Sequence, residues 1–379
     1  MDILKGISIR RTPQSRPATT GQVRNSAGGY AFALDDAARL RRFLILGVDG
    51  GTYYTDAQTL ALENTEVLRR LAADDPQGLV TTITEVSLSG AAPKQNPALF
   101  ALAYATSVPE ARDAALAALP KVARTGTHLF TFATYVEQFR GWGRGLRRAV
   151  GSWYTARDAD ALAYQAVKYR QRDGWTHRDL LRLAHPKVDD PALRATLDWI
   201  AHGTVGEETP TLIEGFVKAR EADATRTDAA ATWARIVCDY HLTWEMLPDA
   251  ALTRPEVWEA LLDVGVPLTA LMRQLPRLTR LGLLPAMGGR TDEIAGQLTD
   301  AARLRAARVH PVSLLVAQRT YASGFSRRGK ASWTSTTKVA DALDAAFYAP
   351  SAPSSPQASA PCSPWTSPAP WACPSPAWP

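Results

Sequence analysis

The sequence predicts an all-α protein organised as an α-solenoid of stacked helical pairs. Between about residues 30 and 348, apolar residues recur at three- and four-residue spacing, which is the pattern of amphipathic helices. Short breaks rich in glycine, proline and aspartate separate these segments, so many short helices follow one another. This arrangement favours a solenoid over an α/β sheet. The segments differ in length and share no fixed-period repeat, so the prediction rests on the helical pattern.

Helices are expected along most of this region. The first is the charged, alanine-containing segment 35–42. Further helices are expected at 57–72, 96–105, 110–118, 191–202 and 211–219. The stretch 79–88 is ambiguous, because the threefold spacing of its Val and Ile residues suits a helix while its apolar character also permits a strand.

Composition sets the class of protein and its surroundings. At 379 residues the chain can bury a large core. Residues 1–29 are polar and basic and are expected to form an extended arm before a helical domain at 30–348. No stretch approaches the ~18 apolar residues that span a bilayer, and the N-terminus lacks the apolar core of a secretory signal. Cys238, Cys362 and Cys373 make no disulfide framework, so a reducing, cytoplasmic setting is expected.

Segment 168–187 concentrates the positive charge. It holds six cations and two acids, a net charge of +4 in a chain whose total is +6. Tyr169, Trp175 and two histidines accompany the cations. Cations neutralise phosphates and flat rings stack on bases, so this composition suits a polyanion-binding surface. From charge alone, a solvated face over a helical hairpin is the alternative.

Local signals in this segment indicate a helix–turn–helix corner. Lys168 and Arg172 are four residues apart and would share one face of a first helix, which Gly174 would end. Thr176 and Asp179 form a capping box that opens a second helix. That helix stops at the proline after the second histidine, so both ends of the corner carry candidate ligand-binding groups.

Two further basic stretches support this surface. Residues 140–148 contain four arginines, one tryptophan and no acid. The cations and histidine of the last stretch are Arg303, Arg305, Arg308, His310, Arg319, Arg327, Arg328 and Lys330. Three basic stretches with nearby aromatic or histidine side chains indicate a nucleic-acid surface, with solvated faces as the alternative.

Signatures of enzymes and metal sites are missing. The sequence has no G-x-x-x-x-G-K-[ST], no G-x-S-x-G and no H-E-x-x-H. The Gly-rich stretch 47–54 has no lysine and is interpreted as a tight turn between helices. Cys238 and His241 have no second pair to complete a zinc site and are interpreted as core residues of one helix. We therefore expect no catalysis, metal or cofactor.

Eight short motifs follow one another across residues 30–348. They are Phe43–Tyr54, Thr127–Phe130, Lys168–Lys187, Glu245–Pro248, Pro255–Trp258, Pro267–Leu271, His310–Leu315 and Ala342–Tyr348. Together, and in this order, they resemble the TROVE domain of the Ro-type RNA-binding proteins, including the bacterial members.

The resemblance implies a monomeric, closed ring of HEAT-like helical repeats. Structured, Y-RNA-like non-coding RNA would dock on its outer basic surface, and single-stranded ends of misfolded RNA would enter the central hole. The implied role is RNA maturation, quality control or decay, with an exoribonuclease as a further partner. Lys168, Arg172 and His185 match residues that contact RNA in this family. Charge alone adds five arginines to the predicted site: Arg140, Arg144, Arg147, Arg148 and Arg170.

The segment 349–379 departs from the family. Relatives continue there into a von Willebrand A-type domain with a D-x-S-x-S metal motif. This segment is instead rich in Pro, Ser and Ala, has no charged residue and carries Trp365, Trp371 and Trp378, so we expect a disordered tail. Regrouping the third base of each codon with the first two of the next permits Asp-Val-Thr-Gly-Ser-Met-Gly from residue 365 onward. Our hypothesis is a frameshift that replaced the A-type domain and its metal site.

The favoured interpretation is a cytoplasmic, non-catalytic RNA-binding protein. The alternative is a helical-repeat protein–protein scaffold whose basic faces are only solvated, which predicts that no RNA accompanies the purified protein. A metal-dependent nuclease is disfavoured, because no acidic cluster lies beside the basic segments.

Overall fold

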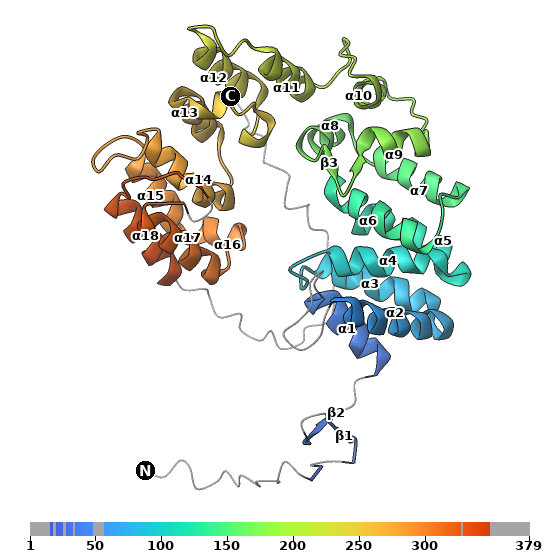
Figure 1. The fold of residues 1–379 in the computed structure, drawn as a ribbon. Coiled ribbons are helices and arrows are strands. Elements are labelled where there is room, and N and C mark those ends of the chain that lie inside the picture. Colours follow the sequence, from blue (N-terminus) through green and yellow to red (C-terminus); the bar gives the residue numbers. More distant parts are fainter. Residues whose placement is uncertain are drawn as a thin grey trace, which may run out of the picture. The chain divides into compact units, whose positions relative to one another are not determined.

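A computed structural model describes residues 16–17, 20–25, 28–32, 35–47, 57–326 and 329–348. The chain divides into two compact units, unit 1 (residues 1–252) and unit 2 (residues 253–379). Eighteen α-helices make up most of the described residues, so the predicted all-α class of helical repeats is confirmed (Figure 1). Closure into a ring stays a prediction, and the predicted tail at 349–379 lies outside the described residues.

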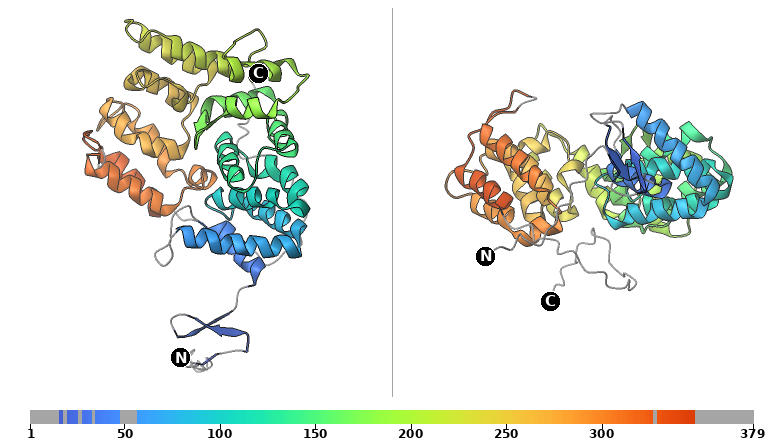
Figure 2. Two further views of the ribbon diagram at one scale, coloured as in Figure 1. Left: turned by 45° about the vertical axis from the view of Figure 1, so that its right-hand side comes forward. Right: turned by 90° about the horizontal axis from the view of Figure 1, so that it is seen from below.

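Unit 1 is a stack of α-helices with two short hairpins. Its helices are α1 (Asp36–Leu46), α2 (Ala57–Asp74), α3 (Pro76–Ser89), α4 (Asn96–Ser107), α5 (Pro109–Val122), α6 (Gly126–Phe139), α7 (Arg144–Thr155), α8 (Ala159–Lys168), α9 (His177–Ala184), α10 (Pro191–His202), α11 (Thr211–Glu221) and α12 (Ala229–Tyr240). In the α3–α7 region, α3 packs against α4 and α5, α4 packs against α5 and α6, and α5 packs against α7 (Figure 2). This is the packing of a helical solenoid.

The remaining elements of unit 1 are short. Strand β1 (Gln22–Arg24), which lies within the predicted arm, pairs antiparallel with strand β2 (Tyr30–Phe32). Strands β3 (Gln171–Arg172) and β4 (Trp175–Thr176) form a second hairpin between α8 and α9. Two 3₁₀ turns, η1 (Trp244–Met246) and η2 (Ala251–Thr253), lie at the end of the unit.

In the described residues of unit 2, helices joined by loops are accompanied by one isolated β-bridge, between Phe325 and Ser332. Its helices are α13 (Pro255–Val264), α14 (Leu268–Arg280), α15 (Thr291–Thr299), α16 (Ala301–Ala306), α17 (Pro311–Ser323) and α18 (Thr337–Tyr348). Helix α18 packs against both α15 and α17, which buries Val339 and Leu343 completely.

Aspartates set where many of these helices begin. The first turn of a helix has amide N–H groups without intrahelical acceptors, and an aspartate at the N-cap accepts from one of them. Such caps open α1, α3, α8, α10 and α16, through Asp35, Asp75, Asp158, Asp190 and Asp300. The aspartate breaks in the sequence pattern are therefore helix starts.

Several helix predictions are confirmed and one interpretation is wrong. The ambiguous stretch 79–88 lies within helix α3, and the helix predicted at 191–202 has those bounds. Cys238 and His241 are exposed rather than core residues. His241 ends α12 with a left-handed backbone (φ 50°), which no helix interior allows. Of the stretch 47–54, only Gly47 lies within the described residues.

The core of unit 1 beneath α7 is aromatic. Trp153 and Tyr154 on α7 are completely buried, and the Trp153 indole N–H donates to the carbonyl of Ala123. The guanidinium carbon of Arg157 lies 3.8 Å from the Trp153 ring centroid. Replacing a buried Trp with Ala lowers the free energy of unfolding by about 3–5 kcal/mol. This packing holds α7 in a fixed position, so the geometry of its outer face is fixed as well.

Candidate nucleic-acid interface

The segment from Lys168 to Arg172 is not the helix that the sequence predicted. Helix α8 ends at Lys168, and Arg172 lies in strand β3, paired with Trp175 of β4. The two residues between the strands, Asp173 and Gly174, both have left-handed backbones (φ 53° and 84°). A two-residue Asp-Gly loop of this kind makes a primed hairpin turn, which competes successfully with continuation of the helix. Contrary to the prediction, Lys168 and Arg172 do not share a helix face.

The second half of the segment is as predicted. Thr176 accepts from the backbone N–H of Asp179, and Asp179 accepts in return from the N–H of Thr176, so the capping box is formed. Helix α9 then buries Leu180 and Leu181 and ends after Ala184.

His185 ends α9 in a strained conformation. It has φ 45° and ψ 54°, a left-handed region that L-residues other than glycine rarely occupy. Its N–H donates to the carbonyl of Leu181, and Pro186 prevents another helical turn. Residues held in such conformations occur often at functional sites. The exposed imidazole of His185 lies at the head of a turn formed by residues 183–187.

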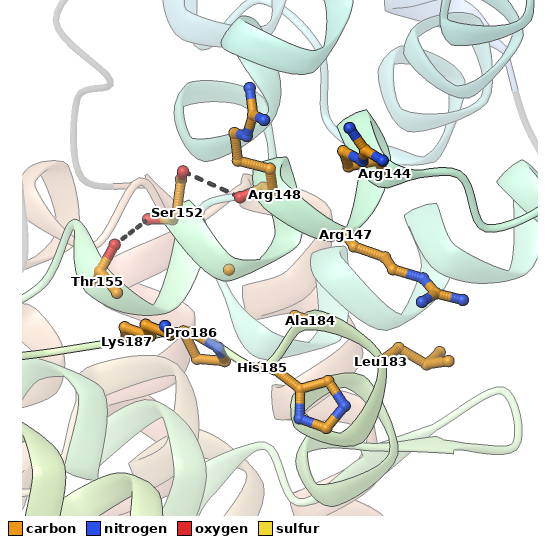
Figure 3. Close-up of a pocket in the computed structure, with 11 residues that line it drawn as sticks. Arg144, Arg147, Arg148, Ser152, Thr155, Leu183, Ala184, His185, Pro186 and Lys187 are labelled. Atoms are coloured by element: carbon orange, nitrogen blue, oxygen red, sulfur yellow. Dashed lines mark hydrogen bonds between the residues drawn. The ribbon is translucent and has the colours of Figure 1, made fainter.

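That turn faces helix α7 across a basic groove. We call this site the α7–α9 groove; its cavity volume is about 430 Å³. Its lining residues are Arg144, Arg147, Arg148, Gly151, Ser152, Thr155, Leu183, Ala184, His185, Pro186 and Lys187. Figure 3 shows Arg144 and Arg148 directed away from the turn, while Arg147 extends on the side of Leu183 and His185. The two walls meet at Gly151, where a Cβ would lie in ordinary van der Waals contact with Pro186, at 3.7 Å.

The charge of the groove is unbalanced. Its lining contains three arginines and Lys187 but no acid, and none of these four cations forms an ion pair within the described part of the chain. The three arginines occupy the first turns of α7, whose N-cap Gly143 supplies no side-chain acceptor. Cations are unfavourable at a helix N-terminus, where the backbone dipole is positive. A bound anion would relieve both this clash and the mutual repulsion of the arginines.

A buried histidine supports the groove from below. His177, the first residue of α9, is 3% exposed, and its Nδ1 lies 2.9 Å from the Tyr154 hydroxyl. Its ring also packs against Phe130 and Trp153. Burial lowers the pKa of His177 to about 4, so the imidazole is neutral at physiological pH. His177 is therefore a packing residue, in contrast to the exposed His185 eight residues later.

Lys168 belongs to a second basic cluster, which borders the β3–β4 hairpin. Its ammonium donates to the Tyr164 hydroxyl at 2.8 Å and lies 5.6 Å from the ring centroid of Tyr169. Burial opposes the charge of Lys168, but the hydrogen bond to Tyr164 and the nearby Tyr169 and Glu245 outweigh it and raise its pKa. The two tyrosine rings therefore hold this cation in a defined direction.

Arg172 and Arg140 are partly engaged by the protein itself. The Nε of exposed Arg172 lies 3.5 Å from Asp173, whose other carboxylate oxygen accepts from Thr131. Arg140 is half-buried, and its Nη1 donates to the carbonyl of Thr106 at 2.6 Å. Burial also lowers the pKa of Arg140. The guanidinium of Arg140 therefore ties two helices together rather than facing a ligand.

The structure thus sorts the predicted site residues into groups. Arg144, Arg147, Arg148 and His185 meet in the α7–α9 groove, whereas Lys168, Arg170 and Arg172 lie on or beside the hairpin, and Arg140 is separate. The sequence reasoning missed Lys187 as a groove residue. Its signal was present, because it follows a helix-stopping proline in the same basic segment.

The third basic stretch lies in unit 2. Arg303, Arg305 and Arg308 are exposed on α16 and the turn after it, and Arg308 has a left-handed backbone (φ 48°). Arg327 and Arg328 lie outside the described residues. The stretch is thus an exposed basic surface in its own unit.

Metal clusters and membrane-spanning helices are both missing from the described residues. These residues contain no group of three or more His, Cys, Asp or Glu side chains that could hold a metal ion. Among the same residues, no helix combines the length and apolar character required to cross a lipid bilayer.

Comparisons with known proteins give a consistent result. The TROVE domain family matches residues 23–202 and 200–322. The chain is 41% identical over 353 residues to a Deinococcus radiodurans protein named RNA-binding protein RO60, covering 91% of this chain and 65% of that relative. It is 30% identical over 424 residues to the Caenorhabditis elegans protein of the same name, covering 90% of this chain and 64% of that relative.

The fold is similar as well. The crystal structure of the D. radiodurans RO protein superposes with a TM-score of 0.73 at 41% identity, over 83% of this chain and 63% of that one. The chain therefore spans about 65% of the length of these relatives.

Proposed function

The chain belongs to the TROVE-domain family, and from that premise we propose that it binds structured RNA through the α7–α9 groove and the neighbouring β3–β4 hairpin. Phosphates would lie against Arg144, Arg147, Arg148 and Lys187. Lys168 and Arg172 would contact the same RNA from the side of the hairpin, and His185 would donate from the head of the turn.

The observation that carries this proposal is the unbalanced charge of the groove. Four cations and a histidine line it without a single acid. A protein-docking surface of ordinary composition mixes both signs, whereas a nucleic-acid surface collects cations and leaves them unpaired. Phosphate neutralisation would release counterions from the RNA and supply most of the affinity.

The chemistry of the lining indicates modest sequence selectivity. The His185 imidazole is the one aromatic ring among the groove residues, so few bases can stack there. The hydroxyls of Ser152 and Thr155 are used within α7, because they donate to the carbonyls of Arg148 and Ser152 (Figure 3). Contacts would therefore go mainly to phosphates, which position an RNA without reading its sequence.

Finer parts of the proposal rest on family membership. They are binding of Y-RNA-like non-coding RNA, capture of single-stranded ends of misfolded RNA, a role in RNA quality control, an exoribonuclease partner, a monomeric ring and a cytoplasmic location. We likewise propose that the chain is not an enzyme, which agrees with the names of its two relatives.

A salt titration tests the proposal. Binding of a fluorescein-labelled hairpin RNA is followed by anisotropy over a range of salt concentrations, for the wild-type chain and for Lys168→Ala combined with Arg172→Ala. We expect the wild-type log Kd to depend steeply on log salt, and the double variant to lose up to about 0.9 units of slope for each phosphate contact removed.

The matched control removes two cations that are already paired. Arg69 pairs with Glu66, and Arg226 pairs with Asp228, both on exposed surface of unit 1. Arg69→Ala combined with Arg226→Ala lowers the net charge equally, and we expect its slope to stay near the wild-type value. A wild-type chain that binds no RNA in a salt-dependent manner contradicts the proposal and favours a protein–protein scaffold.

A further inference from the structure

Two arginines from distant parts of unit 1 meet over one aromatic ring. The guanidinium carbon of Arg170 lies 5.6 Å from the ring centroid of Phe216, and that of Arg220 lies 5.5 Å from the same centroid. The two carbons are therefore no more than about 11 Å apart. Arg220 is four residues after Phe216 on α11, so both share a helix face, whereas Arg170 comes from the chain just after α8.

The ring is fixed and the arginines are exposed. Phe216 is 6% exposed and packs edge-on against Trp199 of α10, with centroids 5.9 Å apart. Both arginines are exposed. A rigid, nearly buried ring attracts guanidinium groups without accepting their conventional hydrogen bonds. It therefore restricts where the two cations can lie while leaving their N–H groups available.

Neither arginine has a partner of opposite charge. Within the described residues, no ion pair and no hydrogen bond from either guanidinium is present, although Glu221 and Asp223 follow Arg220 closely in sequence. Asp223 instead accepts from Thr225, and Glu221 lines a separate pocket with Lys218 and Arg235. Like charges within about 11 Å of each other repel weakly at a water-exposed surface, and a bound anion would remove this repulsion. Each guanidinium offers a planar fork of donors that fits phosphate oxygens.

We propose that Arg170 and Arg220, held over Phe216, form a phosphate clamp for the RNA backbone on the α11 side of the β3–β4 hairpin. This inference rests on the proposed function and extends its surface to α11, which the basic stretches of the sequence do not include. Because Phe216 is buried, no base can stack on its ring, and we assign the two guanidinium groups to phosphates. The contribution of the clamp is therefore independent of RNA sequence.

The test uses Arg220→Ala in the full chain, with the labelled hairpin RNA and a labelled oligouridylate as separate probes. We expect the Kd for the hairpin to rise about three- to tenfold at low salt, with a slope reduced by up to about 0.9. The same fold-change is expected for two hairpins that differ in sequence. A larger loss with oligouridylate than with the hairpin assigns the clamp to single-stranded phosphates, and the reverse assigns it to the duplex.

Two further variants separate charge from geometry. Arg220→Lys keeps the charge but loses the fork, so it should retain the salt slope while recovering only part of the affinity. Arg170→Ala combined with Arg220→Ala should cost less than the sum of the single changes, because both arginines hold one phosphate. Arg220→Gln, which keeps the stem over the ring, replaces Arg220→Ala if thermal melts show that the alanine variant is unfolded.

Arg226→Ala is the matched control, because Arg226 is exposed nearby and paired with Asp228 at 2.8 Å. If Arg220→Ala binds RNA as Arg226→Ala does while the groove variants lose affinity, the clamp is refuted and the proposed function stands. If the wild-type chain itself binds neither probe, the proposed function fails and the clamp fails with it.

Discussion

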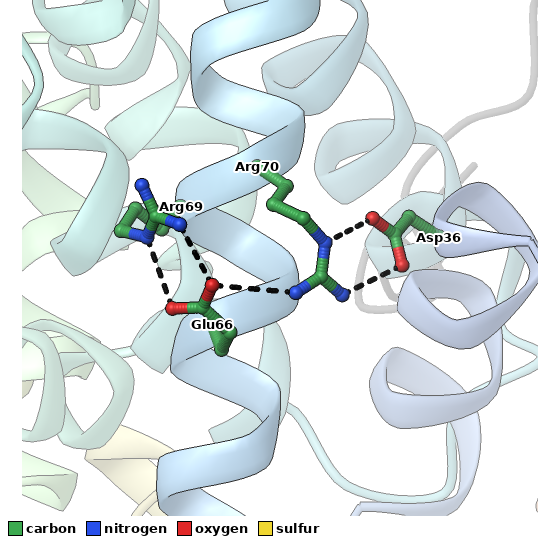
Figure 4. Close-up of polar contacts among 4 residues, drawn as sticks. All are labelled: Asp36, Glu66, Arg69 and Arg70. Atoms are coloured by element: carbon green, nitrogen blue, oxygen red, sulfur yellow. Dashed lines mark hydrogen bonds and ion pairs between the residues drawn. The ribbon is translucent and has the colours of Figure 1, made fainter.

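The α1–α2 junction and the α7–α9 groove use arginine in opposite ways. At the junction, Arg70 on α2 makes a bidentate contact with Asp36 on α1, at 2.6 and 2.9 Å. Glu66 joins Arg70 to Arg69, so two acids balance two arginines (Figure 4). In the groove, three arginines and a lysine have no acid at all. Paired arginines hold helices together, and unpaired ones leave their charge for a ligand.

This difference gives each region a different signature. Removing an arginine from the junction should affect folding and leave RNA binding intact. Removing arginines from the groove should affect RNA binding and leave folding intact, because repulsion is removed along with the ligand contacts.

The largest effect is expected from replacing Arg144, Arg147 and Arg148 together with alanine. Loss of three phosphate-neutralising groups should weaken hairpin RNA binding roughly a hundredfold at low salt and reduce the slope by up to about 2.7. The melting temperature should stay the same or rise, because alanine favours helices and the clash at the α7 N-terminus is removed. Anisotropy titrations and thermal melts on the same preparations measure both. A lower melting temperature with unchanged RNA affinity would reverse the roles assigned to the two regions.

The second prediction concerns the buried His177. Burial lowers the pKa of His177 to about 4 from an ordinary 6.5, so protonation favours the unfolded chain. Wild-type stability should therefore fall as pH drops from 6.5 toward 4, by up to roughly 3 kcal/mol from this residue. His177→Gln cannot titrate, so its stability deficit relative to wild type should be largest near pH 7 and shrink on acidification. Urea unfolding across this pH range measures it, and a deficit independent of pH would contradict the assignment.

The smallest effect is expected at the junction. Arg70→Ala should lower the melting temperature modestly, because the ion pair is partly exposed, and should leave the RNA affinity unchanged. The hydrogen bond from Arg70 holds the pKa of Asp36 below its ordinary 3.8. The pair therefore stabilises the fold above about pH 3.8, and this contribution is lost as the pH falls through the lowered pKa. Melts of Arg70→Ala and wild type should accordingly converge in acid; a difference that persists there would place the role of Arg70 elsewhere.

The sequence was sufficient for the class of fold and for much of the groove. Apolar spacing and aspartate breaks located the helices because both are local signals, as at Asp190 before α10. The arginines of α7 were found because they cluster within one short stretch. That these arginines line one groove with His185 depends on how α7 packs against α9, which no local pattern reports.

Other features could not be reached, or were missed, for identifiable reasons. The Asp173–Gly174 loop is a strong hairpin signal, but the four-residue spacing of Lys168 and Arg172 suggested a helix instead. Arg140 contacts the backbone carbonyl of Thr106, 34 residues earlier, and Arg220 shares the Phe216 ring with Arg170, 50 residues earlier. A carbonyl has no sequence signature, so the contact of Arg140 with Thr106 could not be foreseen; Arg140 does not line the α7–α9 groove, and its binding of RNA stays a prediction.

The most direct test of the central claim is a crosslinking map. Hairpin RNA is bound to the wild-type chain, irradiated, and the crosslinked peptides are identified by mass spectrometry. We expect crosslinks in α7, in the β3–β4 hairpin and in the 183–187 turn, and we expect the α7 crosslinks to be lost when the salt concentration is raised. Crosslinks confined to the basic stretch 303–330 of unit 2 would contradict it.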